Sequence, residues 1–321
     1  MLQYTLRRLL GMIPLLFLIS FVVFSLAKLM PGDPFGGEID PTKTDPKYIE
    51  EMREKLGYND PIHVQYWRWI TRFVQGDFGM STTYKMPAAD LIMERMPNTL
   101  LLAITSLVIT YVFAFFMGMY AGRRPYTIGD HMIAVYNYVA LAIPSFVAAI
   151  VAIYFFSFKL DLFPYSGSVA IGLQPGTWEY YVSRLHHVAL PALVLGLMST
   201  ASYTQFLRND VIENSRKDYV RTARAKGVKE SRIYYKHILR NSLIPLVTFL
   251  GFDLVTLVSG AVITETIFTY PGIGHLFLHS VETRDYAVVM SITMLLSLFT
   301  LLGNLLADIL YGIVDPRIRL E

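Results

Sequence analysis

Two acidic residues occupy positions where a carboxylate is costly. Asp253 interrupts the otherwise uncharged run 243–264, and Glu265 follows that run directly. A carboxylate at the middle of a membrane-spanning helix costs about 2.5–3.5 kcal/mol on insertion scales. Asp253 therefore either faces a polar pathway, where it meets a cationic group, or is paired with a polar side chain of a neighbouring helix or protonated. Glu265 either shapes the outer end of such a pathway or caps a helix.

A second group of residues has the types that bind metals. His275, His279 and Glu282 fall at positions i, i+4 and i+7, which places them on one face of a helix. A short helix after Pro271-Gly272 that dips into the outer face is the structural alternative, and we favour it. The chain also has no cysteine, no Gly-x-Ser-x-Gly elbow and no aspartate-rich motif. We therefore predict neither a catalytic residue nor a metal site.

The sequence contains no phosphate-binding loop of the Gly-x4-Gly-Lys-Ser/Thr type. Its only Lys-Ser/Thr pair, Lys43-Thr44, has no preceding glycine. We therefore predict that the chain does not hydrolyse ATP by itself and holds no cofactor.

The composition is that of a membrane protein. Of 321 residues, 54% are apolar and 17% are charged, whereas soluble domains are about a quarter charged. The apolar residues are gathered into long uncharged runs, which excludes an ordinary soluble enzyme, a disulfide scaffold and a disordered chain. A net charge of +3 is too small to indicate nucleic-acid binding.

Six apolar runs are long enough to cross a bilayer, since a spanning helix needs about 20 apolar residues. Pro144 lies within the third run, where a kink is tolerated. The first run is too long for the apolar part of a signal peptide, and Lys28-Leu29 spoil a cleavage site, so we predict a retained helix. The runs are Leu9–Ala27, Asn98–Gly122, Met132–Phe158, Val188–Leu207, Leu243–Thr264 and Ala287–Ala307.

Basic residues orient these spans. Ten of the 28 Lys and Arg residues lie in the loop 208–242, and basic loops stay on the cytoplasmic side. We therefore predict an all-α integral membrane protein with six spans and with both termini in the cytoplasm. Its parts are the first span in 1–30, an extracytoplasmic helical segment in 31–97, a core of five helices in 98–312 and a cytoplasmic tail in 313–321.

The outer segment 31–97 has the pattern of a folded insertion. Asp45-Pro46 and Asp60-Pro61 each resemble a helix N-cap followed by proline at the first helical position. Apolar residues follow each pair at helical spacing, and Gly57 and Gly76 can end the two helices. The segment is either a cap on the membrane surface or a docking surface for an external partner, and both can hold.

The loop 208–242 is the most informative segment. Residues 218–226 form a short helix-compatible stretch, Gly227 can end it in a left-handed conformation, and a second helix begins near Lys229. The result is a helical knuckle on the cytoplasmic face. A loop of this charge could simply rest on anionic lipid, but two short helices joined at a glycine favour a protein contact. In the membrane, the Gly118-x3-Gly122 pair can allow close helix packing.

This loop resembles the cytoplasmic motif of permease subunits of binding-protein-dependent ATP-binding-cassette importers. That motif has the form Glu-Ala-Ala, three residues, Gly, nine residues, Ile-x-Leu-Pro. Ala223 and Gly227 match it, whereas Arg221, Thr222 and Arg240 stand where the glutamate, the first alanine and the proline are expected. The variant Tyr-Val-Arg-Thr-Ala-Arg-Ala-Lys-Gly, followed by His-x-Leu-Arg-Asn-Ser-Leu-Ile-Pro, resembles the dipeptide and oligopeptide branch, which includes nickel permeases.

Further segments of the same branch run along nearly the whole chain. They include Pro31-Gly32-Asp33-Pro34, Gln75-Gly76-Asp77-Phe78-Gly79, Arg95-Met96-Pro97-Asn98-Thr99, Glu265-Thr266-Ile267-Phe268, Tyr270-Pro271-Gly272-Ile273-Gly274 and Asp315-Pro316-Arg317.

The resemblance implies an importer in a prokaryotic cytoplasmic membrane. Its parts would be this chain, a second homologous permease, two ATP-binding subunits inside and a solute-binding protein outside. This chain would then form half of the translocation pathway for peptides, with nickel or another small solute as the alternative cargo. Asp253 and Glu265 are the pathway candidates, and Asp253 would meet a cationic peptide terminus. The residues expected to couple the ATPase are Tyr219, Arg221, Thr222, Ala223, Arg224 and Gly227.

Overall fold

The computed structural model describes residues 2–29, 60–243, 246, 249–250, 253 and 261–314. Within these ranges the secondary structure is helical, apart from turns and one isolated bridge between Met80 and Pro87. The predicted all-α class is confirmed. The chain divides into two compact units, one made mainly of Leu100–Tyr270 and Gly303–Glu321, the other of Leu2–Thr99 and Pro271–Leu302.

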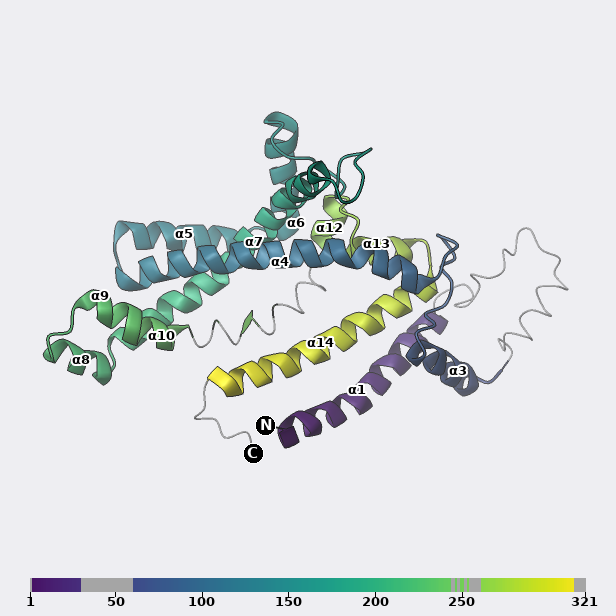
Figure 1. Ribbon diagram of the computed structural model, residues 1–321, viewed down its shortest axis with the longest axis horizontal. Coiled ribbons are helices and arrows are strands. Elements are labelled where there is room, and N and C mark those ends of the chain that lie inside the picture. Colours follow the sequence, from purple (N-terminus) through teal and green to yellow (C-terminus); the bar gives the residue numbers. More distant parts are fainter. Residues whose placement is uncertain are drawn as a thin grey trace. The chain divides into compact units, whose positions relative to one another are not determined.

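The described helices vary widely in length, and two short π-helical stretches, η2 and η3, continue α6 and α9. In chain order they are α1 (Leu2–Leu29), α3 (Ile62–Val74), α4 (Ala88–Arg123), α5 (Ile128–Ala142), α6 (Ser145–Ala152), η2 (Ile153–Lys159), α7 (Trp178–Ser215), α8 (Asp218–Ala225), α9 (Glu230–Arg232), η3 (Ile233–Ile238), α10 (Leu239–Ser242), α12 (Val262–Ile267), α13 (Ile273–Glu282) and α14 (Tyr286–Val314) (Figure 1).

Four single helices are long and apolar enough to cross a membrane, and a bent pair makes a fifth candidate. They coincide with five of the six predicted apolar runs, so a multi-pass helical protein is confirmed. The run 243–264 falls largely outside the described residues, and the count of six stays a prediction. The four single helices are Thr5–Leu29, Ala88–Arg123, Trp178–Ser215 and Tyr286–Ile309.

The bent pair is more sharply broken than the predicted kink. Ile128–Ala142 and Ser145–Lys159 meet at an angle of 102°. The break falls at Pro144, which has no N–H to continue a helix and restricts the residue before it to extended conformations. Ile143 accordingly has φ −84° and ψ 124°. The Pro144 carbonyl accepts hydrogen bonds from Val147 and Ala148, which starts α6.

Helices α4 and α7 pack closely, because glycines on each helix face side chains of the other. A Cβ atom added at Gly118 would lie 2.8 Å from the Leu207 Cβ, and one at Gly122 would lie 2.7 Å from the Val211 Cβ. The close packing predicted for the Gly-x3-Gly pair is confirmed. On the α7 side, Gly196 makes the same kind of contact with α4, where an added Cβ would lie 2.9 Å from the Ser106 carbonyl oxygen.

In the other unit, α3 packs on α1 through aromatic side chains. Tyr66 lies edge-on to Phe24 at 5.5 Å between ring centroids, and its hydroxyl is 2.7 Å from the Ser20 hydroxyl. The second helix of the outer segment is therefore confirmed, but its predicted cap is wrong. Pro61 occupies the N-cap position, and the Asp60 carboxylate binds Arg68 at 2.8 Å instead. The first predicted helix of that segment lies outside the described residues.

Candidate functional site

The predicted knuckle is the helix pair α8 and α9, joined at Gly227. Gly227 has φ +72°, in the left-handed region that favours glycine. Its N–H donates to the Arg224 carbonyl at 2.9 Å, and the Val228 N–H donates to the Ala223 carbonyl at 3.2 Å. These two bonds make a Schellman motif, so the predicted glycine stop is confirmed. Together α8, α9 and α10 gather at the end of α7 (Figure 1).

Helix α8 has two distinct faces. Val220 and Ala223 are 0% and 7% exposed, because they pack among residues of α7 and η3 in one apolar cluster. The structure thus places Ala223 on the inner face of α8, where its small side chain lets α8 pack closely against α7 and η3. The remaining predicted coupling residues lie on the exposed side of the knuckle, and they are Tyr219, Arg221, Thr222, Arg224 and Gly227.

Hydrogen bonds tie the base of α8 to the elements beneath it. The Tyr219 hydroxyl donates to the Asn214 side-chain oxygen at 2.9 Å, and the Asn214 amide donates to the Ser242 hydroxyl at 3.1 Å. Asn214 and Ser242 are buried, at 7% and 0% exposure. Residues from α7, α8 and α10 therefore meet at one buried amide. The base of α8 is thereby joined to both α7 and α10.

An ion pair closes the turn between α8 and α9. The Arg224 guanidinium donates to both carboxylate oxygens of Glu230, at 2.6 and 3.3 Å. These hydrogen bonds hold the pKa of the Glu230 carboxyl below its usual value. Both side chains are about half exposed, so solvent screens the pair and its contribution to stability is small. The pair spans Gly227 and links the end of α8 to the start of α9.

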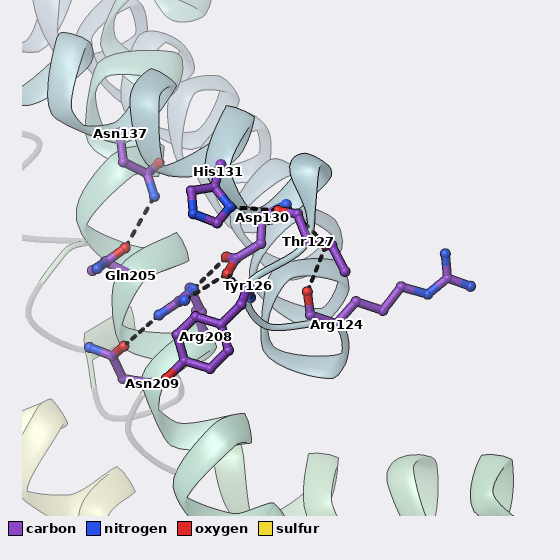
Figure 2. A network of polar contacts seen from close by, with 9 residues as sticks. All are labelled: Arg124, Tyr126, Thr127, Asp130, His131, Asn137, Gln205, Arg208 and Asn209. Carbon is purple, nitrogen blue, oxygen red and sulfur yellow. Dashed lines mark hydrogen bonds and ion pairs between the residues drawn. The ribbon is translucent and has the colours of Figure 1, made fainter.

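A second, buried ion pair joins the start of α5 to α7. Arg208 donates to the two carboxylate oxygens of Asp130 at 2.6 and 2.7 Å, and the Tyr126 N–H adds a bond of 2.8 Å. Figure 2 shows the guanidinium of Arg208 facing the Asp130 carboxylate, while the side chain of Arg124 points away. Asp130 is 3% exposed. Through this pair, α5 is held to the same helix that supports α8.

The predicted pathway residues have different surroundings. Asp253 is partly exposed, and it accepts hydrogen bonds of 2.5 Å from the hydroxyls of Tyr111 on α4 and Tyr203 on α7. One of the sequence alternatives, pairing with polar residues of neighbouring helices, is thus present. Glu265 in α12 is 0% exposed. That burial favours the structural role over the pathway role for Glu265.

The histidine pattern after Pro271 lies on α13, in agreement with the predicted short helix. Within the described part of the chain, no group of three or more His, Cys, Asp and Glu side chains is placed to hold a metal ion.

Several residues of the site escaped the sequence analysis. Tyr111 and Tyr203 carried a signal, because each places a hydroxyl inside an apolar run, where it needs a partner. Asp130 carried a weaker one, as the single acid of the basic 122–131 loop. Nothing in the sequence pairs Asn214 with Ser242, because residues 28 positions apart meet only after the loop has folded.

Comparison with known proteins agrees with this architecture. Residues 114–320 match the family described as the binding-protein-dependent transport system inner membrane component, and residues 1–103 match its N-terminal family. The oligopeptide transport system permease protein AppB of Bacillus subtilis is 41% identical over 99% of this chain and 100% of that protein. The glutathione transport system permease protein GsiC of Escherichia coli K12 is 37% identical over 99% of each chain.

Solved structures share the fold at low sequence identity. An inward-facing form of the MetNI methionine ABC transporter aligns with a TM-score of 0.54 and 16% identity, over 70% of this chain and 96% of that one. An amino acid ABC transporter with histidines aligns with a TM-score of 0.53 and 14% identity, over 71% and 94%. With two family matches that cover nearly all of its length, the chain belongs to the binding-protein-dependent transport system inner membrane components, the permeases of ABC importers.

Proposed function

We propose that this permease imports peptides across the cytoplasmic membrane of a prokaryote. The observation that carries the proposal is its similarity, over essentially the full length, to a permease named for oligopeptides and to one named for glutathione, itself a tripeptide. Permease subunits of the family work with ATP-binding and solute-binding components. The proposed assembly contains a second homologous permease, two ATP-binding subunits in the cytoplasm and one solute-binding protein outside.

The proposed topology has six spans with both termini in the cytoplasm. It follows from the basic loops, above all 208–242, and from the sixth apolar run 243–264. In this orientation α8 and α9 face the ATP-binding subunits. ATP and magnesium are bound by those partners, since the chain has no phosphate-binding loop.

The proposed mechanism is alternating access, in which partner binding shifts the equilibrium between two conformations. ATP closes the two ATP-binding subunits, and their movement displaces α8. The buried contact of Val220 and the hydrogen bond from Tyr219 to Asn214 both join α8 to α7, which supports a lever role. The pathway then opens toward the solute-binding protein, and ATP hydrolysis returns it to the inward-facing form. Asp253 remains the candidate pathway residue.

Reconstitution tests the proposal directly. The four kinds of subunit are assembled in proteoliposomes that contain ATP, and uptake of radiolabelled tri-alanine, glutathione and Ni²⁺ is measured in parallel. We expect peptide uptake that requires both ATP and the solute-binding protein. Uptake of Ni²⁺ without uptake of either peptide would show that the chain is a nickel permease instead. A chain that recruits no ATP-binding subunit would contradict the transport mechanism itself.

A further inference from the structure

Asp253 and two tyrosine hydroxyls form a polar cluster that could bind a ligand as well as join helices. Tyr111 donates to one carboxylate oxygen and Tyr203 to the other, both at 2.5 Å. Both donors are neutral hydroxyls, and no ion pair joins Asp253 to a cationic side chain among the residues that the structure describes. The two hydrogen bonds hold the carboxylate between α4 and α7 but supply no positive charge.

Aromatic rings extend from this carboxylate. The Tyr111 and Tyr203 rings lie 5.3 Å apart between centroids, and the Tyr203 and Phe249 rings lie 6.0 Å apart. Phe206 continues the series at 5.1 Å from Phe249, and it is 54% exposed. The face of an aromatic ring attracts a cation, most strongly where water is scarce. A carboxylate beside a run of rings is an environment suited to an organic cation.

The hydrogen-bonding capacity of the cluster also fits such a ligand. An ionised carboxylate has about four lone-pair sites, and the tyrosines use two of them. Each tyrosine hydroxyl donates its hydrogen to Asp253 and can still accept another. A primary ammonium group has three N–H donors and one positive charge. It would satisfy the free acceptors and balance the charge, whereas an acetylated amine would balance no charge.

We propose that Asp253, Tyr111 and Tyr203 form a binding site for a primary ammonium group of the transported peptide. The group is either the free amino terminus or a lysine side chain. This inference rests on the proposed function, because it assumes that peptides enter the permease. Tyr111 comes from α4 and Tyr203 from α7, so a bound ammonium would lie between those two helices.

Equilibrium dialysis of the purified permease–ATPase complex, without the solute-binding protein, tests the site. The probes are radiolabelled tri-alanine, N-acetyl-tri-alanine and N-acetyl-alanyl-lysyl-alanine amide. We expect the complex to bind tri-alanine at least tenfold more tightly than its acetylated form. Asp253→Asn removes this preference, and Asp253→Glu retains part of it. If the lysine peptide binds as tightly as tri-alanine, the ammonium site is supported and a lysine side chain can fill it.

Controls separate this site from a purely structural contact. Tyr136 also donates a hydroxyl hydrogen bond at 2.6 Å, to the Leu197 carbonyl of α7, and no carboxylate among the described residues accepts from it. Tyr136→Phe should keep the preference for tri-alanine. If Asp253→Asn lowers thermal stability but leaves the tenfold preference intact, the ammonium site is wrong and the cluster only joins helices. Equal binding of tri-alanine and its acetylated form by the unchanged complex also overturns the inference.

Uptake by the complete importer in proteoliposomes distinguishes this inference from the proposed function. Uptake of tri-alanine by the unchanged importer, with no ammonium preference in dialysis, would refute the site and leave peptide import intact. Absence of all peptide uptake would refute the proposed function. We expect Asp253→Asn to lower tri-alanine uptake about tenfold and the control Tyr136→Phe to leave uptake unchanged.

Discussion

At the scale of single residues, the ion pairs of this chain are either buried or exposed to solvent, and the two kinds respond differently to substitution. The Asp130 carboxylate is almost fully enclosed, and Arg208 satisfies both of its oxygens. The Asp218–Arg221 pair on α8 is exposed and longer, at 3.4 Å. A buried pair is not itself a large source of stability, but removing one partner leaves an uncompensated charge. An exposed pair leaves no such charge, because water replaces the lost partner.

Substitution of the buried pair should therefore have a large effect on stability. Arg208→Gln leaves Asp130 without its charge partner, and we expect a loss of about 3 kcal/mol in the free energy of unfolding. The matched control, Arg221→Gln, should change it by less than about 1 kcal/mol. Unfolding of the detergent-solubilised protein, followed by circular dichroism, measures both. Equal losses for the two variants would show that burial does not govern the Asp130 pair.

The Arg224–Glu230 pair predicts that motion at the Gly227 turn between α8 and α9 depends on pH. The folded pKa of Glu230 is lowered, so the pair contributes stability above the unfolded pKa, about 4.3. That contribution is lost as the pH falls through the lower, folded value. Since the chain has no cysteine, a single spin label at Lys226→Cys can report motion of the turn at Gly227. Label mobility should rise on acidification below about pH 4.3, and the same label on a Glu230→Gln background should show high mobility at every pH.

At the scale of elements, glycines determine how helices approach one another. Helix α4 lies against α7 at Gly118 and Gly122, where any side chain would meet Leu207 or Val211. By contrast, Gly11 in α1 has no atom within 4 Å of an added Cβ. The sequence predicted this contact because the two glycines share one face of an apolar helix. It could not predict the partner helix.

Gly122→Leu should therefore separate α4 from α7. We expect a loss of at least about 1–3 kcal/mol, because overpacking forces backbone shifts. Gly11→Leu adds the same volume where space is open and should leave stability unchanged. Thermal unfolding and the yield of monodisperse protein in detergent compare the two. Unchanged stability of Gly122→Leu would contradict the tight contact.

Substitution of Gly227 tests the role of the knuckle formed by α8 and α9. Nothing lies within 4 Å of an added Cβ there, so the cost of a side chain comes from the backbone at φ +72°. A β-branched residue in this conformation costs about 1–2 kcal/mol. We expect Gly227→Val to lower uptake relative to ATP hydrolysis, and Gly227→Asn, which tolerates the left-handed region, to stay close to the unchanged protein. Normal assembly with full transport in Gly227→Val would contradict the lever role.

At the scale of the whole molecule, local patterns predicted the elements and missed the contacts between them. The apolar runs identified five candidate spans because hydropathy is a property of a continuous segment. Helix α7 nevertheless extends past Leu207 to Ser215, since a helix can continue through polar residues. The knuckle at Gly227 was predicted, because its stop is local. The partners of Asp253 and Asp130 were not, since they come from distant parts of the chain.

The central claim is that α8 carries the contact with an ATP-binding subunit. Thr222→Cys places one thiol on the exposed face of α8. Ile171→Cys places one between the third and fourth predicted spans, which the proposed six-span topology puts outside the cell. Each variant is labelled with a photoreactive maleimide in the assembled complex and irradiated. We expect Thr222→Cys to cross-link to the ATP-binding subunit and Ile171→Cys not to do so. A complex that assembles while Thr222→Cys gives no cross-link to that subunit would contradict the claim.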